Sequence, residues 1–379
     1  MKKITYLVLH LGFGGVEKAV ANQANILCKH YDVEIISAYQ MYDTPPFYID
    51  PRVKITYLMT DLKPNKSEFK AAIQSKNPVN IIKQAIISLK VLRKRVSLMK
   101  KAVKNLNSDI IISTRILYNP VLSKYHKPGI ITISQEHRHH DGDEKYIQKL
   151  CKSVENLDYF MPVSQELTDF YADRLKNKHV TCKYIPHNLD SWYNEVSALT
   201  EKIIVSVGRF SPEKGYSDLV DIFNIFYKTH PDWKLALVGD GDQLPVIKEK
   251  INTLNLKDNV ILYGFQDKAH VNEILHNSSI YAMASFSESF GIVLIEAQSH
   301  GLPCVAFDSA RGAFEIIENN INGYLIPHRN KDLFAEKLSQ LADDKIIRQN
   351  MGKNGRKNSE KYKEENIAKQ LNDFLHSIL

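Results

Sequence analysis

Two glutamates flank a short polar loop in the second half of the chain. Glu288 lies in the loop Ser285–Gly291, and Glu296 follows eight residues later in an apolar stretch with helical spacing. A glycine at a helix start leaves backbone N–H groups at the positive end of the helix dipole, which favours a phosphate or another anion. Carboxylates accept hydrogen bonds from hydroxyl groups. Phosphate-binding amides between two carboxylates therefore predict a sugar-phosphate ligand. The structural alternative is an ordinary helix start, because Ser/Glu-rich turns often begin helices.

A second candidate phosphate site follows the apolar stretch Lys202–Val207, which we expect to be a strand. The next residues read GRFSPEKG and place Arg209 and Lys214 five positions apart between Gly208 and Gly215. Arginine offers a planar pair of donors and lysine a compact point charge, and together they suit one diphosphate. A charged, solvent-exposed loop is the structural alternative.

The N-terminus has the same organisation. Residues 4–9 predict a buried strand, the sequence GFGG follows, and residues 16–29 predict a helix. A strand, a glycine loop and a helix form the phosphate-facing unit of doubly wound sheets. Because the third glycine of the dinucleotide motif is absent, a tight turn at Gly14 and Gly15 is an equally good interpretation.

A histidine-rich segment, QEHRHHD, follows the predicted strand 130–134. Consecutive side chains cannot all converge on one ion, and the spacing H-E-x-x-H is absent, so the pattern does not favour a metal site. Polar residues where a parallel strand ends lie at the ligand crevice of such folds. We therefore expect His137, Arg138 and His139 to lie near a ligand.

These motifs together resemble retaining nucleotide-sugar glycosyltransferases of the GT-B fold, in the large bacterial α-hexosyltransferase family (glycosyltransferase family 4-like). The segment Glu288–Glu296 is similar to the E-x7-E signature of that family, and GRFSPEKG to its G-R-x-x-x-x-K-G loop. The resemblance implies catalytic roles for Glu288, Arg209, Lys214 and His137. It implies donor-binding roles for Gly14, Gly15, Gly208, Phe265, Ser289, Phe290, Gly291, Ile292, Val293 and Glu296, with no metal and no cofactor beyond the sugar donor.

Length and composition set the wider frame. The chain has 379 residues, of which 44% are hydrophobic and 25% charged, typical of a globular protein with more than one domain. We expect an α/β protein in which two Rossmann-like domains face a central cleft. Residues 1–188 would bind the acceptor and residues 189–379 the donor, with the terminal helix returning to the first domain. Two helices are expected after Asp332. No apolar run is long enough to cross a bilayer, and the four scattered cysteines fit a reducing cytosol.

The positive charge is concentrated in one segment. Residues 61–107 contain twelve Lys/Arg and two acidic residues, whereas the whole chain carries only +7. Ile82, Ile86, Leu89, Leu92, Val96, Met99, Val103 and Leu106 recur every three or four positions and predict one apolar helix stripe. An ordinary amphipathic helix packed on its domain is one interpretation. Because no acidic residue lies between Lys83 and Lys104, binding to an anionic membrane surface is the other.

The sequence thus predicts an enzyme that moves a hexose or N-acetylhexosamine from a UDP-sugar to a lipid-linked or cell-surface acceptor, at the cytoplasmic face of the membrane. A catalytically silent partner subunit is an alternative, as is a nucleotide-sugar epimerase or sugar phosphorylase on the same fold. No nucleic-acid motif accompanies the basic segment.

Overall fold

The computed structural model describes residues 1–61 and 64–379, without the side chain of Lys66. Lys63 of the predicted basic segment therefore lies outside the described residues. The chain divides into two compact units, one formed by Met1–Ile185 with Ala368–Leu379 and the other by Pro186–Ile367. The division falls near the predicted boundary after residue 188, and the end of the chain groups with the first unit.

The first unit contains a seven-stranded parallel sheet in the order β3-β2-β1-β4-β5-β6-β7. Its strands are β1 (Lys3–Val8), β2 (Asp32–Ser37), β3 (Lys54–Tyr57), β4 (Ile110–Ser113), β5 (Ile131–Glu136), β6 (Tyr159–Pro162) and β7 (Thr181–Cys182). From β1 the chain continues to β2 and β3 on one side, and β4 to β7 lie on the other. The loops after β1 and β4 therefore leave neighbouring strands at the reversal of strand order, where ligands bind in such sheets.

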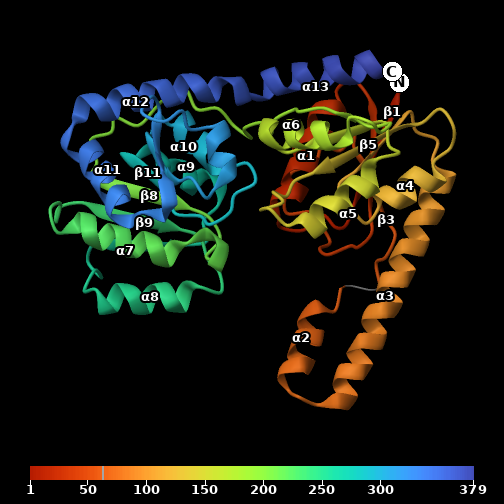
Figure 1. Ribbon diagram of the computed structural model, residues 1–379, viewed down its shortest axis with the longest axis horizontal. Helices are drawn as coiled ribbons and strands as arrows, with labels where there is room; N and C mark the ends of the chain where they lie inside the picture. Colours follow the sequence, from red (N-terminus) through yellow and green to blue (C-terminus); the bar gives the residue numbers. More distant parts are fainter. Residues whose placement is uncertain (62–63) are drawn as a thin grey trace. The chain divides into compact units, whose positions relative to one another are not determined.

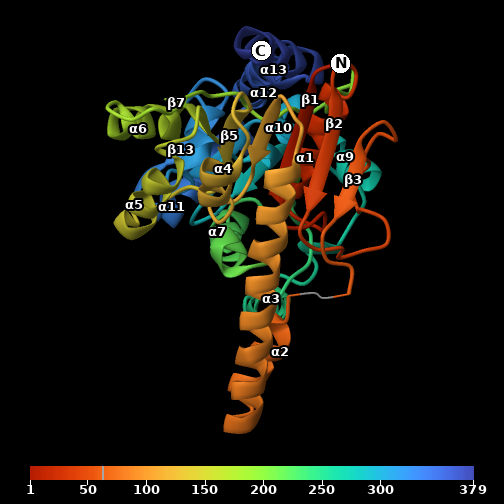
Figure 2. The same cartoon turned by 90° about the vertical axis from the view of Figure 1, so that its right-hand side faces the viewer.

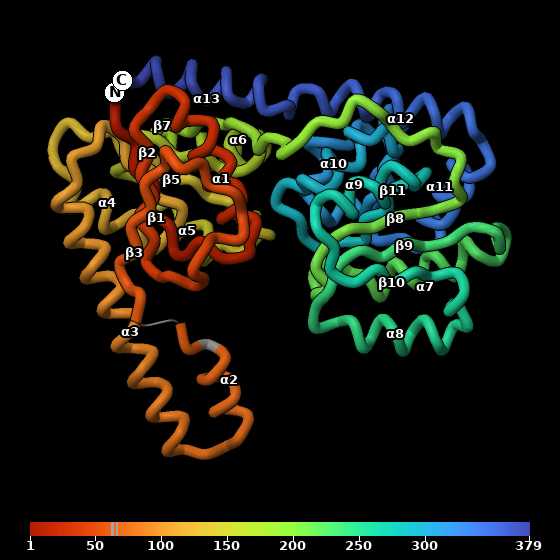
Figure 3. The backbone as a smooth tube through the Cα atoms, turned by 180° about the vertical axis from the view of Figure 1, so that it is seen from behind, coloured from red at the N-terminus to blue at the C-terminus, as the bar shows by residue number. Residues whose placement is uncertain are grey.

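Helices connect these strands, as parallel pairing requires. They are α1 (Gly15–Leu27), α2 (Lys66–Gln74), α3 (Pro78–Asn105), α4 (Asn119–Tyr125), α5 (Glu144–Val154) and α6 (Gln165–Leu175). The tube in Figure 3 shows both chain ends close together in this unit. There Tyr159 of β6 packs edge-on against Phe374, with ring centres 5.2 Å apart.

The second unit has a six-stranded parallel sheet in the order β10-β9-β8-β11-β12-β13. Its strands are β8 (Ile203–Val207), β9 (Lys234–Val238), β10 (Val260–Gly264), β11 (Ile280–Met283), β12 (Cys304–Phe307) and β13 (Gly323–Ile326). The order reverses between β8 and β11. The loops that carry GRFSPEKG and Glu288 therefore leave adjacent strands at the carboxyl edge of the sheet.

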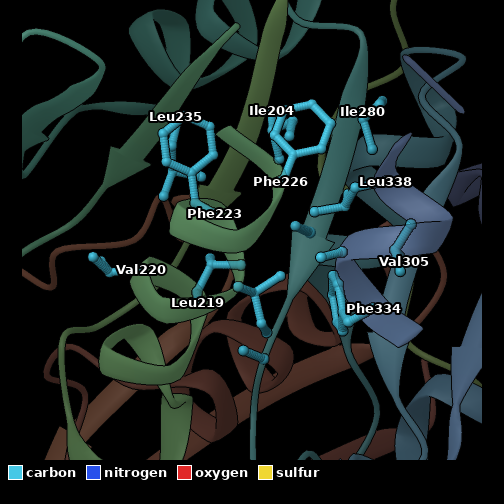
Figure 4. Close-up of a cluster of buried hydrophobic side chains, with 14 of the residues drawn as sticks. Ile204, Leu219, Val220, Phe223, Phe226, Leu235, Ile280, Val305, Phe334 and Leu338 are labelled. Carbon is cyan, nitrogen blue, oxygen red and sulfur yellow. The ribbon is translucent and has the colours of Figure 1, made fainter. Parts of the chain in front are cut away.

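The helices of this unit cover both faces of its sheet. They are α7 (Tyr216–Tyr227), α8 (Leu244–Thr253), α9 (Lys268–His276), α10 (Ile292–Ser299), α11 (Lys331–Asp343) and α12 (Lys345–Ser359), with 3-10 turns at Pro212–Lys214, Arg311–Glu315, Pro327–Arg329 and Glu360–Tyr362. The last helix, α13 (Glu364–Ile378), begins in this unit, but its residues from Ala368 onward belong to the first unit. Phe223 and Phe226 of α7 and Phe334 of α11 belong to one buried apolar cluster with strand residues (Figure 4). This cluster fixes the strands whose ends carry the candidate site.

Two sequence expectations need correction. The chain after Asp332 forms three helices and not two, because Asp344 caps a new helix by accepting hydrogen bonds from the amides of Ile346 and Ile347. The predicted apolar stripe of α3 also divides in two. Met99 and Val103 are buried, whereas Ile82, Ile86, Leu89 and Leu92 are exposed. No helix among the described residues is long and apolar enough to cross a membrane.

Candidate functional site

The Glu288 loop joins β11 to α10 in the second unit. Gly291, directly before the helix, has φ of 91°, a left-handed conformation that glycine adopts without a side-chain clash. No side chain within the described ranges caps the start of α10. The first amides of this helix therefore remain oriented for an anion, as the glycine pattern predicts.

Glu288 and Lys214 meet across the two neighbouring loops. The Lys214 ammonium donates to Glu288 Oε2 at 2.5 Å, and both side chains are only partly exposed. Lys214 ends the 3-10 turn after β8, and Glu288 follows β11. The two residues are 74 positions apart in the chain. Their contact follows from the reversal of strand order between β8 and β11, which places the two loops side by side.

Backbone contacts fix these loops to each other. The Phe286 amide donates to the Glu213 carbonyl oxygen at 2.8 Å. Gly215 has φ of 65°, and a Cβ atom there would lie 2.1 Å from the carbonyl oxygen of Ala284. Only glycine permits this approach. Arg209 is exposed and forms no ion pair within the described part of the chain, so its guanidinium is accessible to an anion beside Lys214.

Arg329 holds the base of the Glu288 loop, a role that sequence reasoning missed. Its guanidinium donates to the carbonyl oxygens of Ala284 and Ser285, each at 3.0 Å, and to Asp218 at 2.7 Å. It also lies 3.5 Å from the ring centre of Phe286. The only sequence signal is an arginine shortly after the segment Gly323–Pro327, and nothing local identifies its partners.

Glu296 lies one turn into α10 and is nearly buried. Its Oε1 accepts a hydrogen bond from Lys268 Nζ at 2.5 Å, and Lys268 is also 4.0 Å from Asp190. Lys268, at the start of α9, is a second residue that the sequence did not reveal. Phe265 follows Gly264 at the end of β10 and is 71% exposed, so its ring is accessible for stacking.

The remaining residues predicted to contact the donor differ in how accessible their side chains and amides are. Ser289, Ile292 and Val293 are partly exposed. Phe290 is buried, with its ring centre 5.3 Å from that of His187 and 5.8 Å from that of Tyr362. A donor contact by Phe290 is therefore restricted to its backbone. The Gly208 amide is already used, because it donates to Val238 O at 2.9 Å.

In the first unit, Gly14 and Gly15 form the start of α1. Gly14 provides no side-chain cap, and a Cβ atom there would lie 2.1 Å from Glu17 Oε2. Glu17 is itself buried and accepts from Arg115 Nη2 at 2.6 Å. Arg115 follows β4, so this ion pair connects the first turn of α1 to the loop after β4. Burial lowers the pKa of the neighbouring His10, although the Glu17 carboxylate opposes the shift.

The histidine segment after β5 separates into different environments. His137 is partly exposed, whereas His139 is buried and accepts a hydrogen bond from the Asp141 amide at 2.9 Å. His140 packs against Phe170, with ring centres 4.4 Å apart, and burial lowers its pKa. Within residues 1–61 and 64–379, no group of three or more His, Cys, Asp or Glu is placed to hold a metal ion.

Glu136, at the end of β5, is a further carboxyl beside His137. It accepts from the Tyr146 hydroxyl at 2.7 Å and from the Arg138 amide at 2.9 Å. Burial raises the pKa of Glu136 despite these hydrogen bonds. The hydrogen bonds fix the carboxyl and thereby the backbone that carries His137.

Several known proteins have similar sequences. The family described as "Glycosyl transferases group 1" matches residues 194–358. The exopolysaccharide phosphotransferase of Streptomyces coelicolor is 26% identical over 388 residues, covering 100% of this chain and 41% of that protein, so the chain spans less than half of this relative. The amylovoran biosynthesis glycosyltransferase AmsD of Erwinia amylovora is 26% identical over 369 residues and 96% of each chain.

The likeness to solved structures covers nearly the whole chain. A variant of S. aureus TarM in complex with Fondaparinux, alpha-GlcNAc-glycerol and UDP has a TM-score of 0.75 at 17% identity, over 98% of this chain and 99% of that one. Two Rossmann-like units with parallel sheets, matched at this level, show the GT-B fold. The matched residues include Lys214, Glu288 and Glu296, so this part of the chain is similar to the glycosyl transferases group 1 family.

Proposed function

We propose that the chain is a retaining glycosyltransferase that moves a hexose or an N-acetylhexosamine from a UDP-sugar to a lipid-linked or cell-surface glycan acceptor. The observation that carries the proposal is the Lys214–Glu288 pair beside the uncapped start of α10. This arrangement combines a cation and backbone amides for phosphate with a carboxylate for sugar hydroxyls. The UDP in the structurally similar TarM complex supports uracil as the base.

Departure of UDP needs stabilisation of negative charge. Arg209, Lys214 and the amides at Gly291–Val293 supply it without a metal ion. An ammonium has three N–H donors, so Lys214 can hold Glu288 while it donates to phosphate oxygens. As the bond between the anomeric carbon and the phosphate oxygen breaks, a bond to the acceptor oxygen forms on the same face. The departing phosphate takes the acceptor proton, and the configuration is retained.

The two glutamates have separate roles in this scheme. Glu288 accepts hydrogen bonds from hydroxyls of the transferred sugar and sets its orientation. Glu296, fixed by Lys268, accepts from the ribose hydroxyls. The family resemblance also implies a sugar contact for His137 and a diphosphate contact for Gly14 and Gly15.

The acceptor side of the proposal rests on relatives and on charge. AmsD is described as an amylovoran biosynthesis glycosyltransferase, and the S. coelicolor relative as an exopolysaccharide phosphotransferase. A cell-surface polymer or its lipid-linked precursor is therefore the proposed acceptor class. Residues 83–104 would hold the enzyme on the anionic inner face of the cell membrane, where such precursors are accessible.

Release of UDP from several UDP-sugars by the purified chain tests the donor half of the proposal. We expect activity that persists in EDTA and that falls about a hundredfold in Lys214→Met, the loss typical of one charge-stabilising donor. Lys257→Met, an exposed lysine in the same unit, is the matched control and should retain full activity. Absence of UDP release with every donor would favour the silent partner subunit, and loss in EDTA reversed by Mn²⁺ would refute the metal-free scheme. Product analysis without acceptor separates transfer from epimerisation or phosphorolysis.

A further inference from the structure

The helical hairpin formed by α2 and α3 extends beyond the sheet of the first unit (Figures 1 and 2). At 1.5 Å per residue, the 28 residues of α3 span about 42 Å. Its C-terminal part packs on the domain through the buried Met99 and Val103. The N-terminal part of α3 contacts α2. The Asn65 side chain, just before α2, forms hydrogen bonds with the side chains of Gln84 and Ser88 in this part of α3.

The outer face of α3 begins with large apolar side chains. Val79, Ile82, Ile86 and Leu89 are 75%, 60%, 48% and 53% exposed. Their spacing of three or four residues places them on one stripe of the helix. Four neighbouring aliphatic side chains on one helix face are not accounted for by the packing of the domain.

The same stripe continues with cations. The next positions at helical spacing are Arg93, Ser97, Lys101 and Lys104, and Lys83 and Lys90 lie beside the apolar part. Between Lys83 and Lys104 the sequence has eight Lys/Arg and no acidic residue. Among the described residues, only Lys94 of these eight has an acidic partner, Asp61 at 3.3 Å, and that pair is exposed. We define Val79, Ile82, Ile86, Leu89, Lys90, Arg93 and Lys101 as the outer hairpin face.

We propose that the outer hairpin face docks on an anionic lipid bilayer. The four apolar side chains enter the boundary between headgroups and acyl chains, and the cations lie on the lipid phosphates. This inference rests on the proposed function, because it gives the membrane contact of that function a defined surface.

Charge and hydrophobicity together select this occupant. A second copy of the chain would bring equal positive charge against the same face, which opposes pairing. An anionic polymer in solution would match the cations but would leave the apolar end of the stripe in water. A bilayer with anionic headgroups satisfies both parts of the face.

Flotation of the full chain with vesicles tests the proposal. The probes are vesicles of phosphatidylcholine alone and vesicles containing about one third phosphatidylglycerol. We expect wild type to float only with the anionic vesicles. Ile82→Gln/Ile86→Gln/Leu89→Gln should bind at least tenfold more weakly at low salt, and what binding is left should disappear at high salt, because only charge contacts remain. Lys90→Gln/Arg93→Gln/Lys101→Gln should also bind at least tenfold more weakly.

The matched control removes the same number of exposed apolar side chains elsewhere. Val246, Ile321 and Ile346 are exposed in the second unit, and their triple replacement by Gln should leave flotation within twofold of wild type. Failure of wild type to float with anionic vesicles overturns the proposal, as does an apolar variant that binds like wild type. In the latter case, binding of inorganic polyphosphate would indicate a polyanion site. A dimer in light scattering that the apolar variant abolishes would equally overturn it.

UDP release without vesicles separates this inference from the proposed function. The hairpin variants carry no donor-site change, so their UDP release should equal that of wild type. Flotation without UDP release from any donor would leave the docking surface intact and refute the enzyme. UDP release without flotation would support the enzyme and refute the docking surface.

Discussion

Replacing Arg329 tests whether the base of the Glu288 loop controls catalysis. Lysine can keep the contact with Asp218, but it cannot also reach the carbonyl oxygens of Ala284 and Ser285 as the guanidinium does. A buried carbonyl that loses its partner costs about 1–3 kcal/mol, and here this is the Ala284 carbonyl, because Ser285 O keeps a hydrogen bond from the Ser309 hydroxyl at 3.1 Å. Arg329 is 20% exposed, so water compensates in part. We therefore expect Arg329→Lys to destabilise the second unit by about 1–2 kcal/mol, a fall in Tm of about 2–8 °C.

Activity should change more than donor affinity in this variant. When the loop is no longer held, Glu288 moves with it, and a misplacement of the bound sugar by about 1 Å can cost about a hundredfold in rate. We expect kcat for UDP release to fall at least tenfold, whereas the Kd for UDP changes less than threefold. Scanning calorimetry and steady-state kinetics provide the two measurements.

The control for Arg329→Lys is an arginine with an equally good carboxylate partner at the surface. Arg52 donates twice to Asp50, at 2.9 and 2.7 Å, and is 57% exposed. Arg52→Lys should change neither Tm nor kcat measurably, because exposed pairs contribute little. If Arg329→Lys behaves like Arg52→Lys in both measurements, the loop does not depend on Arg329 and the reasoning is refuted.

Three further predictions concern other features of the second unit. Gly215→Ala should destabilise the protein much more than Gly142→Ala does. A left-handed alanine costs about 1–2 kcal/mol at either position, but only at position 215 does its Cβ also clash with Ala284 O. An equal fall in Tm for the two variants would argue against the close approach at Gly215. Burial lowers the pKa of His300 to about 4. Between pH 6.5 and 4 the folded state therefore binds fewer protons than the unfolded state, and the free energy of unfolding falls as the pH drops through this window. Between pH 7 and 5, wild type should lose about 2 kcal/mol more than His300→Gln in urea unfolding, and identical pH profiles would contradict this assignment. Glu296→Ala should mainly raise KM for the donor and Glu288→Ala mainly lower kcat, and the same rise in KM with unchanged kcat in both variants would remove their separate roles.

Local sequence patterns sufficed for much of the fold. Alternating apolar runs and glycine turns predicted the strands at Lys3–Val8 and Ile203–Val207 within one residue. Both signals depend only on residues close together in the sequence. The loop before α10 was also predictable, since a left-handed glycine at a helix start has a local cause. The division of the last part of the chain into three helices was harder to predict, because the break at Asp344 depends on a single side-chain cap.

The partners of the charged residues were decided by the tertiary structure alone. Arg329 and Asp218 are 111 positions apart, and Arg115 and Glu17 are 98 apart, and no local pattern links them. Strand order determines such pairings, because it decides which loops leave neighbouring strands. The apolar stripe of α3 shows the same limit. Its period fixed which side chains share a face, but only the packing of the domain decided that Met99 is buried and Ile82 is exposed.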